Sequence, residues 1–108
     1  MSKNDFDFDF TVIGGGSGGY AAARTAHSLG MKTAVIDGAE ELGGLCILRG
    51  CMPSKTLIES ADRQLTIERA AEFGLEAQAG VPDSRAIRDR KRRLIADFAG
   101  YRQGQLQD

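Results

Sequence analysis

The chain has 108 residues, 42% of them apolar and 27% charged, which is enough for one small domain with a modest hydrophobic core. Its formal net charge of -1 gives no electrostatic reason to expect nucleic acid or an anionic membrane as a partner. No apolar run approaches the roughly 20 residues that a membrane helix requires, so the function must be read from local motifs.

The first ten residues do not resemble a secretory signal. Asp5, Asp7 and Asp9 interrupt them, and no basic stretch precedes an apolar one. A cytoplasmic protein is therefore expected. In that compartment two cysteines are more often catalytic or metal-binding than a structural staple, which draws attention to Cys46 and Cys51.

A strand, a helix and a second strand are predicted before the middle of the chain. Apolar residues alternate with polar ones at Phe6, Phe8, Phe10 and Val12. This alternation predicts a strand whose aromatic face lies in the core. After a glycine cluster, the alanine-rich residues 20–29 predict a helix that Gly30 is placed to end. Residues 32–37 predict a second, mostly buried strand, parallel to the first with a right-handed crossover.

Two further helices are predicted in the second half of the chain. Residues 38–50 contain four glycines and indicate a loop. Pro53 suits the first turn of a helix, where its missing N–H costs nothing, and apolar residues recur at helical spacing over residues 54–73. After a loop over residues 74–82, a last helix is expected from about Asp83 to Tyr101.

Basic residues crowd the last predicted helix at Arg85, Arg88, Arg90, Lys91, Arg92 and Arg93. A nucleic-acid surface is one interpretation of such a cluster. The same segment also has apolar residues at helical spacing, at Ile87, Leu94, Ile95 and Phe98. We therefore expect an amphipathic helix whose charged residues face solvent.

The glycine cluster matches the dinucleotide-binding pattern G-x-G-x-x-G at Gly14, Gly16 and Gly19. It follows a predicted strand and opens a predicted helix, which is the context that gives the pattern its meaning. Gly14 would allow the tight turn, Gly16 the approach of a pyrophosphate, and Gly19 close packing of the helix on the strand. The helix N-terminus, at Ser17 and Gly18, would offer N–H groups and a positive dipole end to the phosphates.

The second predicted strand ends at Asp37, where a carboxylate is placed to hydrogen-bond a ribose hydroxyl. A basic residue there would instead have indicated a 2′-phosphate. The alternative is that the glycines only form a turn and that Asp37 only caps a loop. The motif by itself does not distinguish FAD from NAD.

Cys46 and Cys51 lie five positions apart, where a helix is predicted to begin. In a regular α-helix this spacing means a rise of about 7.5 Å and side chains about 140° apart. A disulfide usually needs Cα atoms within about 6.8 Å, so a bridge requires irregular backbone, which Gly50 can provide. Strained and accessible disulfides of this kind tend to be the reducible ones.

The position of Cys51 also favours redox chemistry. The positive end of the following helix and the ammonium of Lys55 would both favour a thiolate, which a redox dithiol needs. Three alternatives compete with this interpretation: two inert buried cysteines, half of a metal site, or a structural disulfide. A zinc site would need further Cys or His ligands, and the one histidine, His27, falls on the first helix, so no metal site is predicted.

The two motifs in this order resemble the N-terminal region of the class I pyridine nucleotide–disulfide oxidoreductases, which include dihydrolipoamide dehydrogenase, mercuric reductase and glutathione reductase. The shared pattern is a glycine-rich nucleotide loop, an acidic strand end and then G-G-x-C-x-x-x-x-G-C-x-P. It is followed here from about Phe8 to Lys55. The matching residues of the cysteine motif are Gly43, Gly44, Cys46, Gly50, Cys51 and Pro53.

The resemblance implies FAD as the first nucleotide. Its binding residues would be Gly14, Gly16, Ser17, Gly18, Gly19, Asp37, Gly44, Cys46 and Lys55. NAD(P)H would pass a hydride to the flavin, which would reduce a Cys46–Cys51 disulfide. Cys51 would face the flavin and Cys46 would meet the substrate, while Lys55 would tune the electronics of the flavin.

Some positions depart from the family pattern. Leu45 stands where many members have Thr, Asp37 stands where Glu is commoner, and residues 47–49 differ from those of several members. Residues 53–55, Pro-Ser-Lys, favour the dihydrolipoamide dehydrogenase and mercuric reductase branch over the glutathione reductases. The expected substrate is therefore a small-molecule or protein-bound disulfide or dithiol, with mercuric ion as an alternative.

Members of the family are several times longer, form homodimers, and have separate NAD and dimerisation domains. Their acid–base catalyst is a His–Glu pair from the partner subunit, a role that His27 cannot fill. We therefore expect residues 1–108 to be the N-terminal part of the FAD-binding domain, a partial Rossmann-like α/β fold, inactive by itself. The alternative is a nucleotide-binding or interaction module without turnover.

Overall fold

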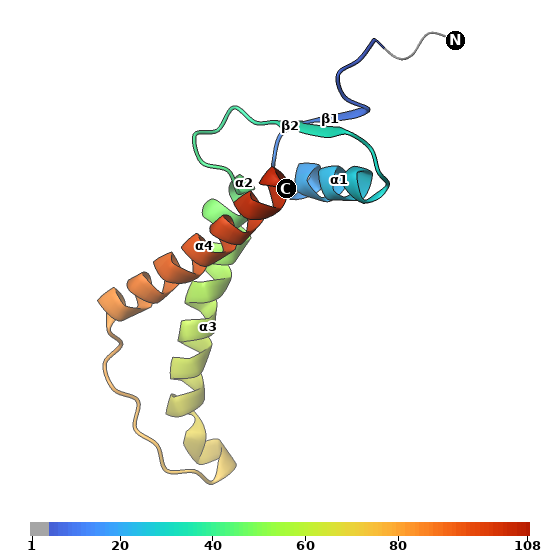
Figure 1. Ribbon diagram of the computed structural model, residues 1–108. Coiled ribbons are helices and arrows are strands. Elements are labelled where there is room, and N and C mark those ends of the chain that lie inside the picture. Colours follow the sequence, from blue (N-terminus) through green and yellow to red (C-terminus); the bar gives the residue numbers. More distant parts are fainter. Residues whose placement is uncertain (1–4) are drawn as a thin grey trace.

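The computed structural model describes residues 5–108 and contains the expected strand–helix–strand unit (Figure 1). β1 (Phe10–Ile13) pairs in parallel with β2 (Thr33–Ile36). Between them in sequence, α1 (Ser17–Ser28) packs on both strands and covers one face of the pair. The partial Rossmann-like α/β fold is thereby confirmed. Residues 1–4, part of the segment on which the absence of a secretory signal was judged, lie outside the described residues.

Small residues allow α1 to lie close against the strands. Ala23 and Ala26 are 5% exposed and face the sheet. A Cβ at Gly19 would overlap the carbonyl oxygen of Gly14 and crowd the side chain of Val12. The helix ends at Ser28, close to Gly30 as expected. The alanine-rich composition therefore supplies both helix propensity and a face flat enough for close packing.

The prediction that the N-terminal phenylalanines form a core face is wrong for this chain. The strand begins only at Phe10, and Phe6 and Phe8 precede it with 80% and 44% of their surfaces exposed. Phe8 instead lies beneath the ammonium of Lys32, 5.1 Å from the ring centroid. On the strand face away from α1, Ile13 is 87% exposed, because the described chain places no element there.

The glycine-rich segment after β2 is not all loop, because it contains the short helix α2 (Gly44–Leu48). Sequence periodicity does not reveal so short a helix, and the glycines beside it indicate a loop. Its anchor is Ile47, which is only 3% exposed. Tertiary packing of this one side chain therefore outweighs the local preference for irregular structure.

Two long helices follow. The first begins and ends earlier than expected, and the second is longer than expected. α3 (Cys51–Glu68) includes Pro53 in its first turn and gives way to a 3₁₀ turn, η1 (Ala70–Phe73). α4 (Ser84–Gln107) extends beyond the predicted end at Tyr101. Its N-cap is Asp83, whose carboxylate accepts hydrogen bonds from the backbone N–H groups of the first turn.

The amphipathic prediction for α4 is confirmed only in part. Ile87, Leu94 and Ile95 are partly buried, but Phe98 is 48% exposed. Two of the basic residues have local partners, since Arg88 pairs with Asp89 at 2.8 Å and Arg90 donates to the carbonyl of Thr56 at 3.2 Å. These partners account for part of the charge on the helix. Among residues 5–108, no helix combines the length and the apolarity needed to cross a bilayer.

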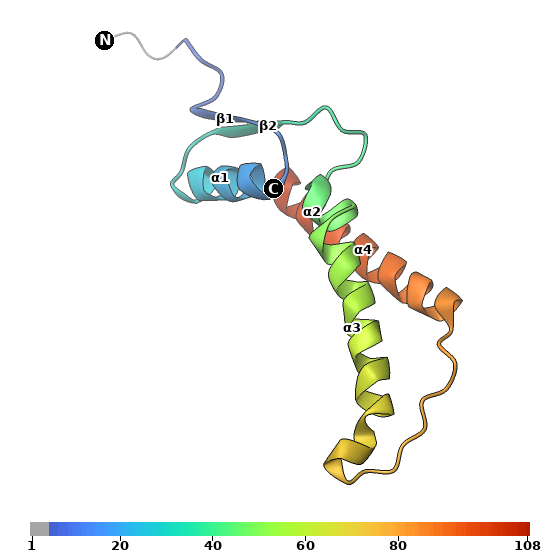
Figure 2. The ribbon, with the colours of Figure 1, turned by 180° about the vertical axis from the view of Figure 1, so that it is seen from behind.

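Figures 1 and 2 show α3 and α4 close together near α2 and diverging away from the sheet, with η1 at the far tip beyond α3, so the described chain is extended. Its radius of gyration is 20.8 Å, against about 13 Å for a compact domain of this length. Its accessible surface is 8379 Å², against about 5,800 Å² for a compact monomer of this mass. Among the described residues, the buried apolar ones are Ala23, Ala26, Ile47, Ala70 and Ala99. The core is therefore thin, and large apolar surfaces stay open.

Two glycines in the first turn of α1 provide a matched test of the packing between α1 and β1. Gly19→Ala should lower the free energy of unfolding by about 1–3 kcal/mol, because the added methyl group has no room beside Gly14. Gly18→Ala meets no atom within 4 Å and should raise it by up to about 1 kcal/mol, through helix propensity. Urea unfolding followed by circular dichroism measures both changes. Equal effects of the two substitutions would contradict the close contact.

Candidate dinucleotide and dithiol site

The turn between β1 and α1 has the geometry of a phosphate-binding turn. Gly14 adopts a φ of 100°, which favours glycine, and its N–H donates to the carbonyl of Ile36 at 2.7 Å. The N-cap of α1 is Gly16, and no side chain of residues 5–108 caps the helix there. A Cβ at Gly16 would meet no atom within 4 Å, so the backbone is open on that side. The exposed residues Ser17 and Gly18 follow in the first turn of α1, where backbone N–H groups have no partner within the helix and are available to an anion.

Asp37 connects the end of β2 to this turn. Its carboxylate accepts hydrogen bonds from the backbone N–H of Gly15 at 2.7 Å and of Ala39 at 2.9 Å. The hydrogen bond from Ala39, and next the one from Gly15, hold the pKa of Asp37 below its ordinary value. Asp37 therefore does cap the loop, as the alternative interpretation required. Each carboxylate oxygen keeps a second lone pair, so a ribose contact is still compatible with this arrangement.

A close contact brings the cysteine motif to the turn between β1 and α1, residues 14–16, which we call the phosphate turn. Gly44, the first residue of α2, has a φ of 77°, and a Cβ there would lie 2.7 Å from the Cα of Gly16. No other residue type fits this position without displacing the turn. Two segments that are far apart in sequence are thereby held together.

The turn, Asp37 and α2 surround a hollow of about 580 Å³. Its lining residues are Gly14, Gly15, Gly16, Asp37, Ala39, Glu40, Glu41, Gly44, Leu45, Leu48 and Arg49. Of the predicted site residues, Gly14, Gly16, Asp37 and Gly44 are brought together here. The others, Ser17, Gly18, Gly19, Cys46, Cys51 and Lys55, lie on the adjoining helices and do not line it.

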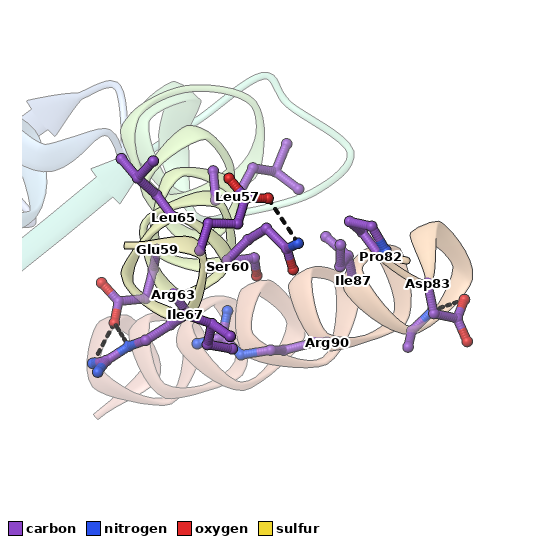
Figure 3. Close-up of a pocket in the computed structure, with 14 residues that line it drawn as sticks. Leu57, Glu59, Ser60, Arg63, Leu65, Ile67, Pro82, Asp83, Ile87 and Arg90 are labelled. Carbon is purple, nitrogen blue, oxygen red and sulfur yellow. Dashed lines mark hydrogen bonds and ion pairs between the residues drawn. The ribbon is translucent and has the colours of Figure 1, made fainter. Parts of the chain in front are cut away.

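A larger hollow, of about 970 Å³, lies between α3 and α4 (Figure 3). Apolar side chains such as Leu57 and Ile87 face it, with the Glu59–Arg63 ion pair at its rim. None of the predicted site residues lines it. The smaller hollow, where the glycines and the acidic residue meet, is therefore the better candidate for a nucleotide.

The two cysteines belong to different helices. Cys46 lies within α2, and Cys51 is the first residue of α3. The backbone breaks between them at Gly50, where a Cβ would lie 2.9 Å from the carbonyl oxygen of Leu45. The irregular backbone expected at Gly50 is confirmed. Both cysteines are free thiols in this structure, so the disulfide between them stays a prediction.

The thiol of Cys51 does not have the lowered pKa that its position suggested. The neighbouring Cys46 raises the pKa of Cys51, first through a hydrogen bond between the two side chains and then through charge repulsion. Lys55, one turn further along α3, does lower the pKa of Cys51, but its effect is smaller. The expectation of a stabilised thiolate at Cys51 is therefore wrong for the dithiol form, because it neglected the adjacent thiol. Within the described chain, no cluster of three or more His, Cys, Asp or Glu side chains could hold a metal ion.

Sequence reasoning missed several residues of the site. Leu48 and Arg49 line the hollow because α2 turns back onto the phosphate turn, and Glu40 and Glu41 line it from the preceding loop. The only signal in the sequence was a group of charged residues between Asp37 and the second cysteine. Because no helix was predicted at this point, that signal could not assign these residues to the site.

Asp37 makes the stability of the chain depend on pH in a defined direction. Because its pKa is lowered in the folded state, its contribution is present above about pH 3.9, the ordinary aspartate value, and is lost as the pH falls through the folded value. Asp37→Asn should therefore be less stable than the wild type at neutral pH and nearly as stable in acid. Urea unfolding over a pH series measures this, with the exposed Asp97→Asn as control. A constant difference across that series would contradict the assignment.

The influence of Cys46 on Cys51 is testable by alkylation. In Cys46→Ala the hydrogen bond and the repulsion are gone, so Cys51 should react with iodoacetamide at lower pH than in the wild type. Adding Lys55→Met should move the reaction of Cys51 back to higher pH, since the lowering charge is removed. Mass spectrometry of the Cys51 peptide against pH gives both midpoints. An unchanged midpoint in Cys46→Ala would contradict the assigned coupling.

Comparison with known proteins identifies the family. Residues 8–100 match the family model described as pyridine nucleotide-disulphide oxidoreductase. Over 93 residues, 86% of this chain, the sequence is 40% identical to dihydrolipoyl dehydrogenase of Bacillus subtilis, covering 19% of that protein. Over 88 residues, 82% of this chain, it is 44% identical to dihydrolipoyl dehydrogenase of Chlamydia muridarum, again covering 19%. Over 67 residues, 62% of this chain, it is 48% identical to glutathione reductase of Yarrowia lipolytica, covering 14%.

The chain thus spans about a fifth of the length of the dihydrolipoyl dehydrogenases it matches. The match runs through both the phosphate turn and the two cysteines, and it includes α3 and most of α4. The sequence motifs, the parallel strand–helix–strand unit and the family model agree, and the chain belongs to the pyridine nucleotide-disulphide oxidoreductase family.

Proposed function

We propose that this chain is the FAD-binding, dithiol-bearing N-terminal part of a flavin-dependent NAD(P)H:disulfide oxidoreductase. One observation carries the proposal: the phosphate turn and the dithiol are connected by α2, a helix of five residues. Gly44 at its start packs on Gly16, while Cys46 lies on the helix and Cys51 follows it. A cofactor held at the turn would therefore be near the reactive sulfur atoms.

The residues present fit an FAD diphosphate and ribose. The open backbone at Gly16 and the uncapped first turn of α1, from Ser17 to Gly19, suit the diphosphate. Asp37 suits the adenosine ribose, and Gly44, Cys46 and Lys55 would lie on the flavin side. When bound, FAD supplies two-electron transfer between a nicotinamide and a sulfur pair.

The chain's own contribution to the chemistry is the dithiol and its protons. Forming the Cys46–Cys51 bond removes two electrons and two protons from the pair, and the reverse reaction returns them. Cys46 raises the pKa of Cys51, so the thiol of Cys51 keeps its proton more firmly in the dithiol form. The resemblance of the cysteine motif to the family pattern supports Cys46 as the thiol that exchanges with substrate and Cys51 as the flavin-facing one. Lys55 opposes part of the rise in the pKa of Cys51.

We propose a dihydrolipoyl group as the dithiol substrate, which the names of the relatives in Bacillus subtilis and Chlamydia muridarum support. Another disulfide is the alternative, because glutathione reductase of Yarrowia lipolytica also matches, and mercuric ion is a further one. The nicotinamide site, the dimer contacts and the acid–base pair would come from other parts of a cytoplasmic homodimer.

A second candidate is a nucleotide-binding module without turnover. The observation that favours it is the extended shape, with 8379 Å² of accessible surface and exposed apolar residues such as Ile13 and Ile36. Such surface is suited to being covered by further protein. The chain by itself would then bind nucleotide without completing the reaction.

Flavin spectroscopy distinguishes the two candidates. FAD is added to the chain, free FAD is removed, and visible absorbance is recorded before and after reduction with dithionite. We expect bound flavin, with a long-wavelength band from the Cys51 thiolate that is lost in Cys51→Ala and kept in Cys46→Ala, because Cys46 raises the pKa of Cys51. Flavin without this band would support the module without turnover. No retained flavin, in a chain whose circular dichroism shows folded helices, would contradict both.

A further inference from the structure

The hollow at the phosphate turn has one cationic lining residue, Arg49. The other charged residues that line it are all acidic: Asp37, Glu40 and Glu41. A dinucleotide carries negative charge on both phosphates of its diphosphate. The acidic side chains around the hollow oppose such a ligand, and Arg49 is the one lining side chain whose charge attracts it.

The backbone holds Arg49 beside the turn. Arg49 is the C-cap of α2, and its N–H donates to the carbonyl of Leu45 at 2.9 Å. The other end of α2 is fixed by Gly44 against Gly16, and its middle by the buried Ile47. A helix of five residues fixed in this way leaves Arg49 about one turn from the phosphate turn.

The side chain of Arg49 is exposed, and within residues 5–108 no hydrogen bond or ion pair holds its guanidinium group. This distinguishes it from Arg88 and Arg90, which have partners on their own or a neighbouring helix. A guanidinium group presents a planar fork of donors that matches two phosphate oxygens at once. The phosphate turn itself offers only backbone N–H groups and about half a positive charge from the helix dipole.

From this charge distribution we propose that Arg49 binds the diphosphate of the dinucleotide. This deepens the proposed function and rests on it: the turn orients the diphosphate, and Arg49 supplies the side-chain charge that the turn lacks. Arg49 also lies between the two cysteines in sequence. The same short segment would then bind the cofactor and set the spacing of the dithiol.

The experiment compares ligands with and without a diphosphate. Binding of FAD, ADP and adenosine to the chain is measured by titration calorimetry for the wild type, Arg49→Gln, Arg49→Lys and the control Arg85→Gln, which removes an exposed charge of α4. Arg49→Gln should weaken ADP and FAD binding about tenfold or more and spare adenosine, because charge-assisted hydrogen bonds to phosphate are lost. Arg49→Lys should recover part of the affinity, and Arg85→Gln should match the wild type.

The outcomes separate this inference from the proposed function. If the wild type binds FAD and Arg49→Gln binds ADP equally well, the role of Arg49 is overturned while the proposed function stands. Weaker binding of adenosine as well as ADP in Arg49→Gln would assign Arg49 to the shape of the hollow, through Glu40 or Glu41, and would overturn the inference too. A folded wild type that binds neither FAD nor ADP would overturn the proposed function and this inference with it.

Discussion

The contact between Gly44 and Gly16 is the constraint on which the rest of the site depends. A Cβ at Gly44 would lie 2.7 Å from the Cα of Gly16, so the two backbones approach as closely as only glycine permits. This contact fixes the start of α2 against the phosphate turn. The positions of Cys46 and Arg49 then follow from the helix itself, because its five residues leave little freedom.

The second support of the site is the C-terminal end of α4, which compensates for a thin core. Gln103 donates to the carbonyl of Leu42 at 2.8 Å, just before α2, and Arg102 stacks on Tyr20 of α1 at 4.0 Å. Arg24 of α1 donates to the carbonyl of Gln105 at 3.1 Å. These polar contacts connect the last turns of α4 to α1 and to the loop before α2. Small alanine side chains form most of the buried core, so these polar contacts add to a modest apolar packing.

The parts of the fold that local chemistry determines were predictable from sequence. Glycine spacing, alanine content and Pro53 place the turn, α1 and the start of α3, since each acts over a few residues. The exposure of Phe6 and Phe8 was not predictable, because alternation shows which face is apolar and not whether anything covers it. α2 was not predictable because its five residues are too few to show a helical period. One buried side chain, Ile47, stabilises it through tertiary packing. The position of Arg49 in the lining of the hollow depends on α2, so it was not predictable either.

The pKa of Cys51 shows why a site must be treated as a unit. Considered alone, a cysteine at a helix start with a lysine one turn away has a lowered pKa, and Lys55 does act in that direction. The break at Gly50, however, turns α3 back toward Cys46, and the adjacent thiol outweighs both favourable effects. The geometry that makes a disulfide reachable is therefore the same geometry that holds the proton on Cys51. In a dithiol of this kind the two thiols cannot both ionise readily, so the pair retains one proton. That proton stays at the sulfur atoms, where the proposed reduction of the disulfide delivers protons.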